Sequence, residues 1–578
     1  MRKTTGRKDD IKKKNSNTKT KENLKKNKRL NFSVELIGGL VETRKVVNIF
    51  PIDCPFGREQ HRFIFKRKSK STLTMSDSTN GHYTNGHSTE PVGQHWRVGL
   101  LNAQCRYLTA ESFGYKVNAN GVGLKKKQLW TLEPFGDDDS VCLRSQLDRY
   151  LSVDHFGNVT CESEEKTEGC KFFVAVANDG TGRWALRNSV RGYFLGAAND
   201  KLLCSAKVPG PAELWTVHLA ARPQVNIRSV GRRRYARLST DHESIHVDAN
   251  TPWGEDTLFT LEFHDGRYAI HTCNDRYLRF DGTLAEGLSP ETLFTLEFHS
   301  GYLALRDTTG RYVAPLGSRA LLKTRSQTVT KDELFFLEDS VPQAAFVAFN
   351  GKYVSVKQGV DVTANQDEVS DHEIFQLEYD IPSKKWCVRT MQDKYWSLQS
   401  SSGIQANADK GSSNSMFSLD WHEDGSVSFV AANDRRVVAK KSGHLYANGD
   451  EDQQESRFYF YLINRPSLVL KCEQGFVGYK SNASPKLECN KAAYETIVVE
   501  KDEKGLCFFK GSNGKYWNVC EDGTITVDSD VRHGFFIELR EPSKLCIKTS
   551  HGSYVMAEKN GTFKVNGANY DTATWWEY

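Results

Sequence analysis

A short pattern of alternating apolar and polar residues recurs along this chain at a nearly constant interval. Its clearest copy is Phe375–Tyr379, with the sequence FQLEY, which closes the stretch that begins at Gly351. A period of two is typical of a half-buried β-strand whose leading aromatic residue and leucine face a core. Twelve such closing elements follow one another 35 to 44 residues apart, and their leading residues are Trp130, Phe172, Trp215, Phe259, Phe294, Phe335, Phe375, Phe417, Phe458, Ile497, Phe535 and Trp576.

A second element repeats in step with the first, near the start of each unit. It reads GKYVSV around Tyr353 and is followed by a further short run, Asp361–Ala364. Twelve copies are centred on Tyr107, Tyr150, Tyr193, Tyr235, Tyr277, Tyr312, Tyr353, Tyr395, Arg436, Phe476, Tyr516 and Tyr554. Since two independent features share one period, the chain is a repeat protein.

Prolines divide the twelve units into four groups of three. They follow a closing element at Pro223, Pro342 and Pro466, with spacings of 119 and 124 residues. Three four-strand units of roughly forty residues are what a β-trefoil requires, whereas a β-propeller closes with about 4–8 blades and its WD dipeptide is missing here. The sequence therefore predicts an all-β fold of four tandem β-trefoil domains, each of three four-strand repeats. We expect a disordered basic and polar N-terminal extension over residues 1–94, followed by trefoils over residues 95–221, 222–340, 341–464 and 465–578.

Pairs that end in glycine mark turns between the short strands. Asp281-Gly282, Ser442-Gly443, Asp522-Gly523 and Asn560-Gly561 each lie between two β runs. Such pairs favour hairpin turns with positive φ. The chain should contain very little helix.

Charge is distributed unevenly along the 578 residues. The formal net charge is +6, but residues 1–74 hold 21 Lys and Arg against 7 Asp and Glu, whereas residues 75–578 hold 57 against 65. A body with net negative charge argues against general nucleic-acid binding, which depends on neutralising phosphates. The extension is either a nuclear-localisation or polyanion-binding tail, or a disordered segment without such a role.

Several function classes lack their signature in this sequence. The thirteen cysteines include no Cys-x-x-Cys pair and no zinc spacing, which predicts reduced thiols in the cytosol. No apolar run reaches the ~18–20 residues of a membrane span, and no signal-peptide core is present. Hydrolase, phosphate-loop and zinc-protease motifs are missing, and His242 with His246 lacks a third ligand. We expect no enzymatic activity, no cofactor and no bound metal.

Eight segments carry a resemblance to a known family. They are TAESFGYKVNANGVGLKKKQLWTLEP from Thr109, RPQVNIRSVGRRRYARLS from Arg222, PWGEDTLFTLEF from Pro252, KDELFFLED from Lys331, ANQDE from Ala364, LINRPSLVLKCEQGFVGYK from Leu462, GKYW from Gly514 and the terminal WEY. These segments resemble fascin, an actin-bundling family. The resemblance runs from about Gly99 to Tyr578, is strongest to the insect-type members, and does not extend to the residues up to about His95.

The resemblance implies that a lysine-rich loop of the first trefoil contacts actin filaments. The loop contains Lys116 and the run Lys125-Lys126-Lys127, which follows the glycine-bearing stretch Asn118–Gly123. Alternation along a strand would place Lys125 and Lys127 on one face. From residue type alone, the alternative is an ordinary solvated surface.

A cleft between the first and fourth trefoils is implied as part of the same actin-binding surface. The matching positions are Arg191 in the first trefoil and Glu473, Gln474 and Lys480 in the fourth. Gly192 follows Arg191 where a basic residue is common in the family, so this patch departs from the family pattern.

Two further features bear on filament contacts and their control. Arg232–Arg234 and Lys440–Lys441 are candidate contacts in the second and third trefoils by charge alone, and ordinary surface is the alternative for both. The family's regulatory serine corresponds to Gly123 here, and no hydroxyl side chain occurs from Asn118 to Lys127. The usual phosphorylation switch is therefore not expected at this position.

The resemblance implies a protein that cross-links filamentous actin into tight parallel bundles through at least two basic surfaces on a rigid body. We expect a monomer in the cytoplasm and actin cytoskeleton, in protrusions such as filopodia, bristles or microvilli, without nucleic-acid binding or membrane insertion. The alternative is a carbohydrate-binding trefoil lectin, since Gln128-Leu129-Trp130 matches the Gln-x-Trp element of ricin-type lectins. A lectin would repeat this element, and here it occurs once.

A chain that starts at Met75 is expected to unfold and bundle filaments like the full chain, because residues 1–74 contribute no repeat strand. The two free energies of unfolding should agree within about 1 kcal/mol. Chemical unfolding and low-speed co-sedimentation with actin filaments measure the two properties. A loss of several kcal/mol, or of bundling, would show that the extension belongs to the folded body.

Overall fold

The computed structural model describes residues 96–135, 140–177, 179–299, 301–450 and 453–578. All of them fall within one compact unit. The expectation of a disordered extension over residues 1–94 also lies outside them.

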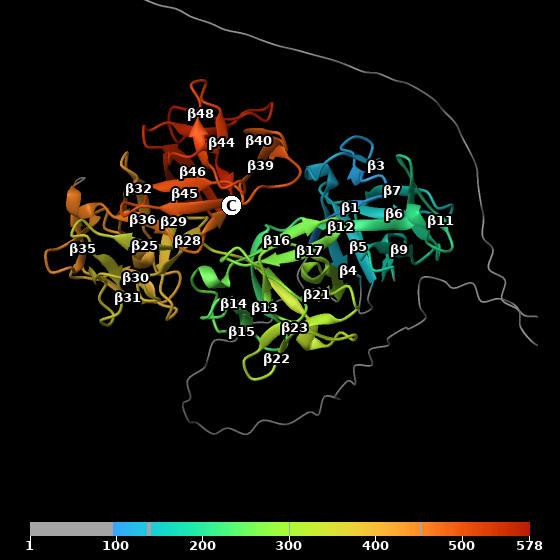
Figure 1. The fold of residues 1–578 in the computed structure, drawn as a ribbon, viewed down its shortest axis with the longest axis horizontal. Coiled ribbons are helices and arrows are strands. Elements are labelled where there is room, and N and C mark those ends of the chain that lie inside the picture. The colour runs from blue at the N-terminus through green and yellow to red at the C-terminus, as the bar shows by residue number, and fades with distance from the viewer. Residues whose placement is uncertain (1–95, 136–139, 178, 300, 451–452) are drawn as a thin grey trace, which may run out of the picture. The chain divides into compact units, whose positions relative to one another are not determined.

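Four successive groups of antiparallel strands make up the described chain (Figure 1). No hydrogen-bonded sheet of the described residues contains strands from two of these groups. The first three groups have twelve strands each and the fourth has thirteen. Three four-strand units per group are what a β-trefoil requires, so the predicted all-β fold of four tandem trefoils is confirmed.

The strands and short 3₁₀ helices of the first two trefoils follow one another with short connections. The first trefoil comprises β1 (Trp96–Leu101), β2 (Tyr107–Ala110), β3 (Val117–Gly121), η1 (Lys126–Gln128), β4 (Trp130–Pro134), β5 (Ser140–Ser145), β6 (Tyr150–Val153), β7 (Val159–Ser163), η2 (Glu168–Cys170), β8 (Phe172–Val176), β9 (Trp184–Asn188), β10 (Phe194–Ala198), β11 (Lys201–Ala206), η3 (Pro211–Glu213) and β12 (Leu214–Leu219). The second comprises β13 (Gln224–Ser229), β14 (Tyr235–Leu238), β15 (Ile245–Ala249), η4 (Glu255–Thr257), β16 (Phe259–His264), β17 (Arg267–His271), β18 (Tyr277–Leu278), β19 (Leu284–Ala285), η5 (Pro290–Thr292), β20 (Thr295–His299), β21 (Tyr302–Arg306), β22 (Tyr312–Leu316), β23 (Leu321–Ser326), η6 (Lys331–Glu333) and β24 (Phe335–Asp339).

The last two trefoils repeat this order. The third comprises β25 (Gln343–Val347), β26 (Tyr353–Ser355), β27 (Thr363–Gln366), β28 (Phe375–Asp380), β29 (Lys385–Arg389), β30 (Tyr395–Leu398), β31 (Ile404–Ala408), η7 (Ser413–Ser415), β32 (Ser418–Trp421), β33 (Val427–Val430), β34 (Arg436–Ala439), β35 (Leu445–Gly449), η8 (Gln454–Ser456) and β36 (Tyr459–Leu462). The fourth comprises β37 (Ser467–Leu468), β38 (Lys471–Cys472), β39 (Gly475–Ser481), β40 (Ser484–Lys491), β41 (Ile497–Lys501), β42 (Cys507–Lys510), β43 (Tyr516–Val519), β44 (Ile525–Ser529), β45 (Gly534–Glu541), β46 (Lys544–Thr549), β47 (Tyr554–Ala557), β48 (Phe563–Gly567) and β49 (Trp576–Glu577).

The twelve anchors of the closing elements form the centre of the trefoil cores. Each of them, from Trp130 to Trp576, exposes 2% of its surface or less. Burying one such side chain contributes about 1.5–3 kcal/mol, so the repeat places a large apolar contribution in every unit. The prediction that these residues face the core is confirmed, while the run predicted at Asp361–Ala364 begins two residues later, as β27.

The tyrosine of the opening element and the glutamate of a closing element form a recurrent polar contact. In the second trefoil, the Tyr312 hydroxyl donates to Glu297 Oε2 at 2.7 Å, and Arg306 approaches Glu297 at 3.5 Å. Strand register explains this, since Arg306 is the cross-strand partner of Tyr312. The same contact joins the pairs Tyr150–Glu133, Tyr235–Glu338, Tyr277–Glu262, Tyr395–Glu378, Tyr516–Glu500 and Tyr554–Glu538.

Every 3₁₀ helix lies just before a closing strand, and the described residues contain no α-helix. This arrangement corrects one expectation, because the lysine run of the first trefoil is not part of a strand. Lys126 and Lys127 lie in η1, and Lys125 caps it. The Gln128 side chain accepts a hydrogen bond from the Lys125 backbone N–H at 3.2 Å and so closes the turn. Strand alternation therefore does not determine where these lysines point.

The four predicted glycine turns have positive φ at the glycine, between 81° and 90°. The residue before each glycine is not in this region, so the turns are not of the doubly left-handed type. In the fourth trefoil, the Gly523 N–H donates to the Cys520 carbonyl oxygen at 2.8 Å, as in a turn that ends on one left-handed residue. A Cβ at Gly523 would also lie 2.5 Å from the Val565 carbonyl oxygen, which excludes a side chain there.

Apolar cores of neighbouring trefoils merge in two pairs. Buried residues of the first and second trefoils form one cluster, and those of the third and fourth form another. Hydrogen bonds cross both joints: the Leu219 N–H donates to the Tyr268 hydroxyl at 2.6 Å, and Lys548 Nζ donates to the His422 carbonyl oxygen at 2.9 Å. The trefoils are therefore packed directly on one another within each pair.

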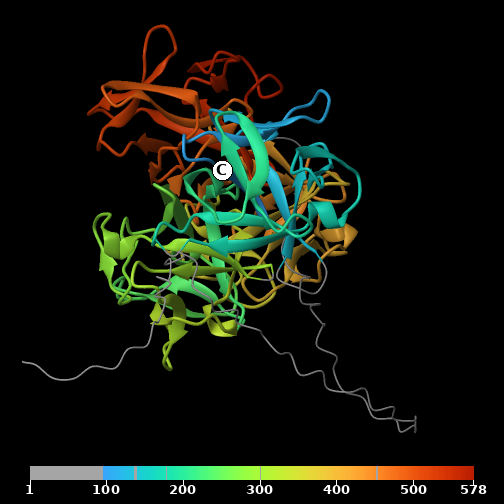
Figure 2. The ribbon, with the colours of Figure 1, turned by 90° about the vertical axis from the view of Figure 1, so that its right-hand side faces the viewer.

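The fourth trefoil also contacts the first two. Gln224 Nε2 of β13 donates to the Ser467 carbonyl oxygen of β37 at 3.0 Å, and the Tyr494 hydroxyl donates to the Leu261 carbonyl oxygen at 2.8 Å. In both Figure 1 and Figure 2, an orange part of the fourth trefoil lies on the side of the blue first trefoil, and residues of both line one cleft.

The side chain of Arg465 lies where the second, third and fourth trefoils meet, and only 1% of it is exposed. Its guanidinium donates to the carbonyl oxygens of Ser340, at 2.9 Å, and Asn464, at 2.8 Å. It lies 5.3 Å from the centre of the Tyr578 ring. Burial lowers the pKa of Arg465 to about 10, so it stays charged at neutral pH. Neutral oxygens and an aromatic face thus hold a buried charge at the ends of three trefoils.

No helix in the described part of the chain is long and apolar enough to cross a membrane.

Arg465→Met should lower the free energy of unfolding by about 2–4 kcal/mol, because two buried carbonyl oxygens lose their donor. Methionine keeps an unbranched apolar stem, so little packing is lost. Arg222→Met is the matched control, since Arg222 is 32% exposed and lies 3.8 Å from Asp339. Its cost should stay below about 1 kcal/mol. Equal costs in denaturant unfolding would contradict the role given to Arg465.

Candidate functional site

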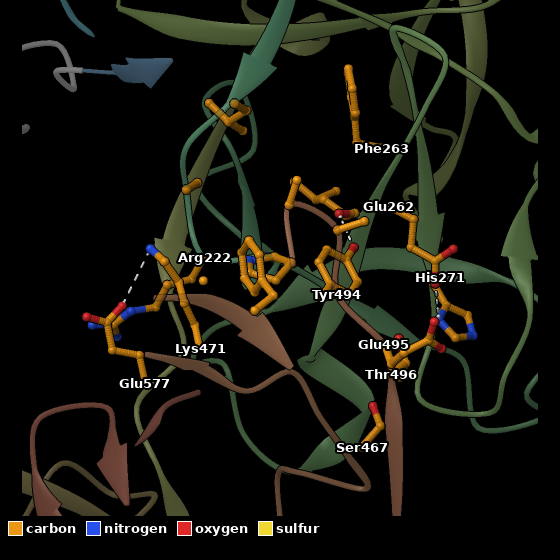
Figure 3. Close-up of a pocket in the computed structure, with 18 of the residues that line it drawn as sticks. Arg222, Glu262, Phe263, His271, Ser467, Lys471, Tyr494, Glu495, Thr496 and Glu577 are labelled. Atoms are coloured by element: carbon orange, nitrogen blue, oxygen red, sulfur yellow. Dashed lines mark hydrogen bonds and ion pairs between the residues drawn. The ribbon is translucent and has the colours of Figure 1, made fainter. Parts of the chain in front are cut away.

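A cleft of about 1220 Å³ opens between the first, second and fourth trefoils (Figure 3). The first trefoil contributes the loop before η1 and the end of β12, and the second contributes β16, β17 and the turn after them. The fourth contributes β38, the start of β39 and the segment before β41. The cleft therefore depends on how three trefoils pack, not on any one of them.

One wall of the cleft carries a network around Glu262. His271 Nδ1 lies 3.0 Å from Glu262 Oε1, and its Nε2 lies 2.9 Å from Asp275 Oδ1. The Tyr277 hydroxyl donates to Glu262 Oε2 at 3.2 Å, and His264 Nε2 lies 3.1 Å from the same oxygen. Figure 3 shows Glu262 and His271 joined on this side of the cleft. The network is the recurrent tyrosine–glutamate contact with a histidine in place of the usual arginine or lysine.

Electrostatic interactions move the pKa values of this pair apart. Burial alone would raise the pKa of Glu262, but the hydrogen bond and charge of His271 outweigh it and lower that pKa. Burial alone would lower the pKa of His271, but Glu262 and Asp275 raise it above its ordinary value. The wall therefore carries an ionised carboxylate beside a histidine that binds a proton more tightly than usual.

Tyr494 crosses the cleft from the fourth trefoil to the second. Besides its hydrogen bond to Leu261, its ring packs edge-on against Phe476 with a centroid distance of 5.6 Å. Burial raises the pKa of Tyr494 well above its ordinary value, so the hydroxyl remains a donor. On the opposite side, Lys471 lies 3.7 Å from Glu577 (Figure 3).

The structure brings four of the predicted site residues to this cleft. Lys125 and Lys126 line it from the first trefoil, and Glu473 and Gln474 line it from the fourth. Six Lys and Arg and six Asp and Glu residues line the cleft, so its charges balance overall. Among these cations, Lys471 and Lys510 each lie within 4.0 Å of a carboxylate, at 3.7 and 3.6 Å, whereas no described carboxylate lies that close to Lys125 or Lys126.

Two other predicted lysines lie near the cleft but not in its lining. Lys127 is exposed, and its Nζ forms an ion pair with Glu111 at 2.8 Å. Glu111 directly follows β2, in the loop between β2 and β3. Lys116 is exposed just before β3. Both residues belong to the same loop region of the first trefoil as Lys125 and Lys126.

The remaining two predicted residues lie elsewhere. Arg191 Nη1 donates to the His155 carbonyl oxygen at 2.8 Å, and the guanidinium lies 4.6 Å from the Tyr193 ring centre. These partners hold Arg191 among other loops of the first trefoil, so it does not line the cleft. Lys480 lies near the end of β39, is exposed, and is not part of the lining either. Arg191 and Lys480 therefore do not line this cleft, and their role as filament contacts stays a prediction.

The Gln-x-Trp element has a structural role. The Gln128 side chain caps η1 and donates to Thr109 Oγ1 at 3.1 Å, while Trp130 Nε1 donates to the Leu108 carbonyl oxygen at 3.0 Å. Trp130 exposes none of its surface. Both side chains are therefore occupied by contacts within the trefoil and do not face a sugar.

Gly123 has room for a larger side chain. A Cβ there would have no heavy atom within 4 Å, and the backbone is not left-handed. A substitution at this position would therefore change the charge near Lys125 without forcing the loop to move.

Sequence reasoning missed the Glu262–His271–Tyr494 wall. A signal for part of it exists, because Glu262 is the glutamate of a closing element and His271 stands where Arg306 and Arg389 stand in other units. For Tyr494 there was no such signal, since its partner lies in another trefoil. Among the described residues, no group of three or more His, Cys, Asp or Glu side chains is placed to hold a metal ion.

Comparison with known proteins gives matches over the whole trefoil region. The family model described as Fascin domain matches residues 104–217, 225–337, 349–460 and 473–578. Each match lies within one of the four predicted domains, whose exact boundaries stay a prediction.

Individual relatives cover most of the chain. Fascin-2 of Bos taurus is 41% identical over 485 residues, which cover 83% of this chain and 98% of the relative. Fascin of Strongylocentrotus purpuratus is 36% identical over 500 residues, covering 84% and 99%, and Fascin-3 of Mus musculus is 26% identical over 494 residues, covering 84% and 98%. None of these three is an insect protein, so the insect-type affinity stays a prediction.

Among solved structures, the designed 3-fold symmetric protein ThreeFoil aligns with 21% of this chain and 97% of its own. The sequence identity is 17% and the TM-score is 0.20, which is too low to carry an argument.

His271→Gln should reduce stability more at low pH than at high pH. A group whose folded pKa is raised stabilises the fold fully below its unfolded pKa of about 6.5, and this contribution is lost as pH rises through the folded value. We expect a loss of about 1–3 kcal/mol near pH 6 that shrinks as the pH approaches 9, measured by denaturant unfolding. His551→Gln, at an exposed histidine, is the control and should show no such trend. A pH-independent loss would mean that His271 acts through packing alone.

Proposed function

Because the chain belongs to the fascin family, we propose that it binds actin filaments and cross-links them into tight parallel bundles. The family match covers all four trefoils, and relatives named fascin align with more than four-fifths of the chain. The observation that carries the proposal is the cleft, where implied contact residues from both ends of the trefoil region, Lys125, Lys126, Glu473 and Gln474, come together.

Three cations of this cleft, Lys125, Lys126 and Arg97, are suited to an acidic partner. Lys471, Lys510 and Arg222 each lie within 4.0 Å of a carboxylate, whereas the described residues place no carboxylate that close to these three. Exposed charges of this kind act on the association rate and salt dependence more than on final affinity. We therefore place filament encounter at the rim formed by the lysine-rich loop, with Lys116 and Lys127 beside it.

Bundling needs a second face held at a fixed distance from the first. The shared cores and the contacts of Arg465 and Tyr494 hold the trefoils in one body, so a second face would keep its orientation. The exposed turns Arg232–Arg234 and Lys440–Lys441 are our candidates for it, by charge and position in other trefoils. Two such faces would convert weak contacts into bundles through multivalency.

The proposed setting is that of a cytoskeletal protein. We propose a monomer in the cytoplasm that acts in actin-rich protrusions, without a catalytic step. No observation favours the lectin alternative, because Gln128 and Trp130 are used within the first trefoil.

Reversing Lys125 and Lys126 to Glu should abolish bundling and leave part of the single-filament binding, because one of two faces is lost. Lys127 is left unchanged, since its pair with Glu111 belongs to the fold. Low-speed and high-speed co-sedimentation with purified filaments measure bundling and binding separately. Lys384→Glu with Lys559→Glu, at two exposed lysines outside the cleft, makes the same change in net charge and is the matched control.

The control should bundle nearly as well as the unchanged protein. Equal loss of bundling in both double variants would show that net charge matters and the cleft rim does not. If the unchanged protein fails to sediment with filaments at all, the proposed function is wrong, and retention on a glycan column would then point to the lectin.

A further inference from the structure

Two cysteines of the fourth trefoil lie together beside the cleft. Cys472 is in β38 and lines the cleft, while Cys489 is in β40, one layer behind it. Cys472 Sγ lies 3.4 Å from the Cys489 carbonyl oxygen, and the two thiols interact electrostatically. Both cysteines are free thiols in this structure.

Local backbone geometry explains why the two thiols meet. Gly475 opens β39 with a φ of 148°, and a Cβ there would lie 2.7 Å from the Lys491 carbonyl oxygen. The glycine therefore lets the turn after Cys472 approach β40 closely. Cys489 lies inside a β-bulge, between the register pairs Phe476–Lys491 and Gly478–Glu488. Bulges change the local course of a strand, and here the Cys489 carbonyl oxygen lies 3.4 Å from Cys472 Sγ.

The surroundings of Cys472 favour its thiolate. Its interaction with the Cys489 thiol lowers the pKa of Cys472, and the backbone N–H groups of Gln474 and Gly475 lower it further against the effect of burial. Elsewhere the described thiols contrast with it: burial raises the pKa of Cys142 to about 12 and that of Cys546 to about 11. Thiolate character and access govern cysteine reactivity. Cys472 is 8% exposed and lines the cleft, whereas Cys489 has no exposed surface.

We propose that Cys472 and Cys489 form a dithiol that peroxides oxidise to a disulfide at the wall of the cleft. Cys472 is the attacking thiol because it faces the cleft, whereas Cys489 is fully buried behind it and contacts the Gly561 and Thr562 carbonyl oxygens. The arrangement of an attacking thiol next to a resolving thiol is typical of redox-sensitive sites.

Oxidation of the two thiols proceeds in two steps. The Cys472 thiolate attacks one oxygen of the peroxide, an S–O bond forms, the O–O bond breaks, and the departing hydroxide takes up a proton to become water. The Cys489 sulfur then attacks the Cys472 sulfenic acid, an S–S bond forms, the S–O bond breaks, and the hydroxyl group leaves as water with the Cys489 proton. Overall, two thiols lose two electrons, and hydrogen peroxide is reduced to two waters.

The disulfide would change a residue that the proposed function uses. Cys472 Sγ contacts Gln474 Oε1 at 3.1 Å, so drawing the sulfur towards Cys489 removes a partner of Gln474 on the cleft wall. If Gln474 contacts filaments, which rests on the proposed function, oxidation should weaken filament binding. The oxidation itself does not depend on that function.

Peptide mapping of the full chain after treatment with hydrogen peroxide tests the chemistry directly. We expect a Cys472–Cys489 disulfide that dithiothreitol reverses, formed about tenfold faster than oxidation of Cys520, a partly exposed thiol of the same trefoil. Cys489→Ser should accumulate sulfenic acid at Cys472, trapped by a cyclic dione, and Cys520→Ser, the matched control, should oxidise like the unchanged protein. Oxidation of Cys520 before Cys472, or a lasting Cys472 sulfenic acid in the unchanged protein, would overturn the proposal.

Co-sedimentation then separates this inference from the proposed function. Reduced protein that sediments with filaments supports the function, and a severalfold weaker binding after peroxide that Cys489→Ser does not show supports the effect on Gln474. If the disulfide forms and filament binding does not change, the proposed oxidation of Cys472 and Cys489 stands, but the proposed effect through Gln474 is wrong. If the reduced protein does not bind filaments, the proposed actin-binding function is wrong, and the peptide mapping still tests the disulfide.

Discussion

The buried guanidinium of Arg465 connects the ends of three trefoils, and the cleft depends on that connection. Its donors satisfy Ser340 at the end of the second trefoil and Asn464 at the end of the third, and its charged face meets Tyr578, the last residue of the fourth. A buried charge is costly unless its partners are placed around it. The contacts of Arg465 therefore hold the second, third and fourth trefoils together, and the second and fourth of these supply walls of the cleft.

Within each trefoil, one polar contact is used again and again and is modified at the cleft. Tyrosine, glutamate and a cation meet in the same register in several units, as Tyr312, Glu297 and Arg306 do. At the cleft this position is held by His271, whose pKa Glu262 and Asp275 raise against the effect of burial, whereas an arginine is always charged. The fourth trefoil adds a different variation, since its bulged strand β40 carries Cys489 behind Cys472. Both variations keep the fold and change only the chemistry that faces the cleft.

Much of the candidate site could be predicted, but only where the family resemblance and local geometry agreed. Lys125, Lys126, Glu473 and Gln474 come together as expected. The orientation of the lysine run could not be read from alternation, because the cap by Gln128 replaces a strand with a 3₁₀ turn. The position of Arg191 outside the lining could not be predicted, because its neighbours in the fold, the His155 carbonyl oxygen and the Tyr193 ring, hold this loop residue.

The sequence by itself determined the repeat, the number of trefoils and the core. Those properties depend on the alternation of apolar side chains at every second residue and on turns a few residues long, such as Asp522-Gly523. Both are local patterns that can be identified in the sequence. Only the tertiary structure decided how the trefoils pack, that Tyr494 reaches Leu261, and that Cys472 meets Cys489. Those contacts join residues that are distant along the chain, through a bulge, a buried charge and shared apolar surfaces. Because the whole fold sets their geometry, no periodic pattern in the sequence marks them.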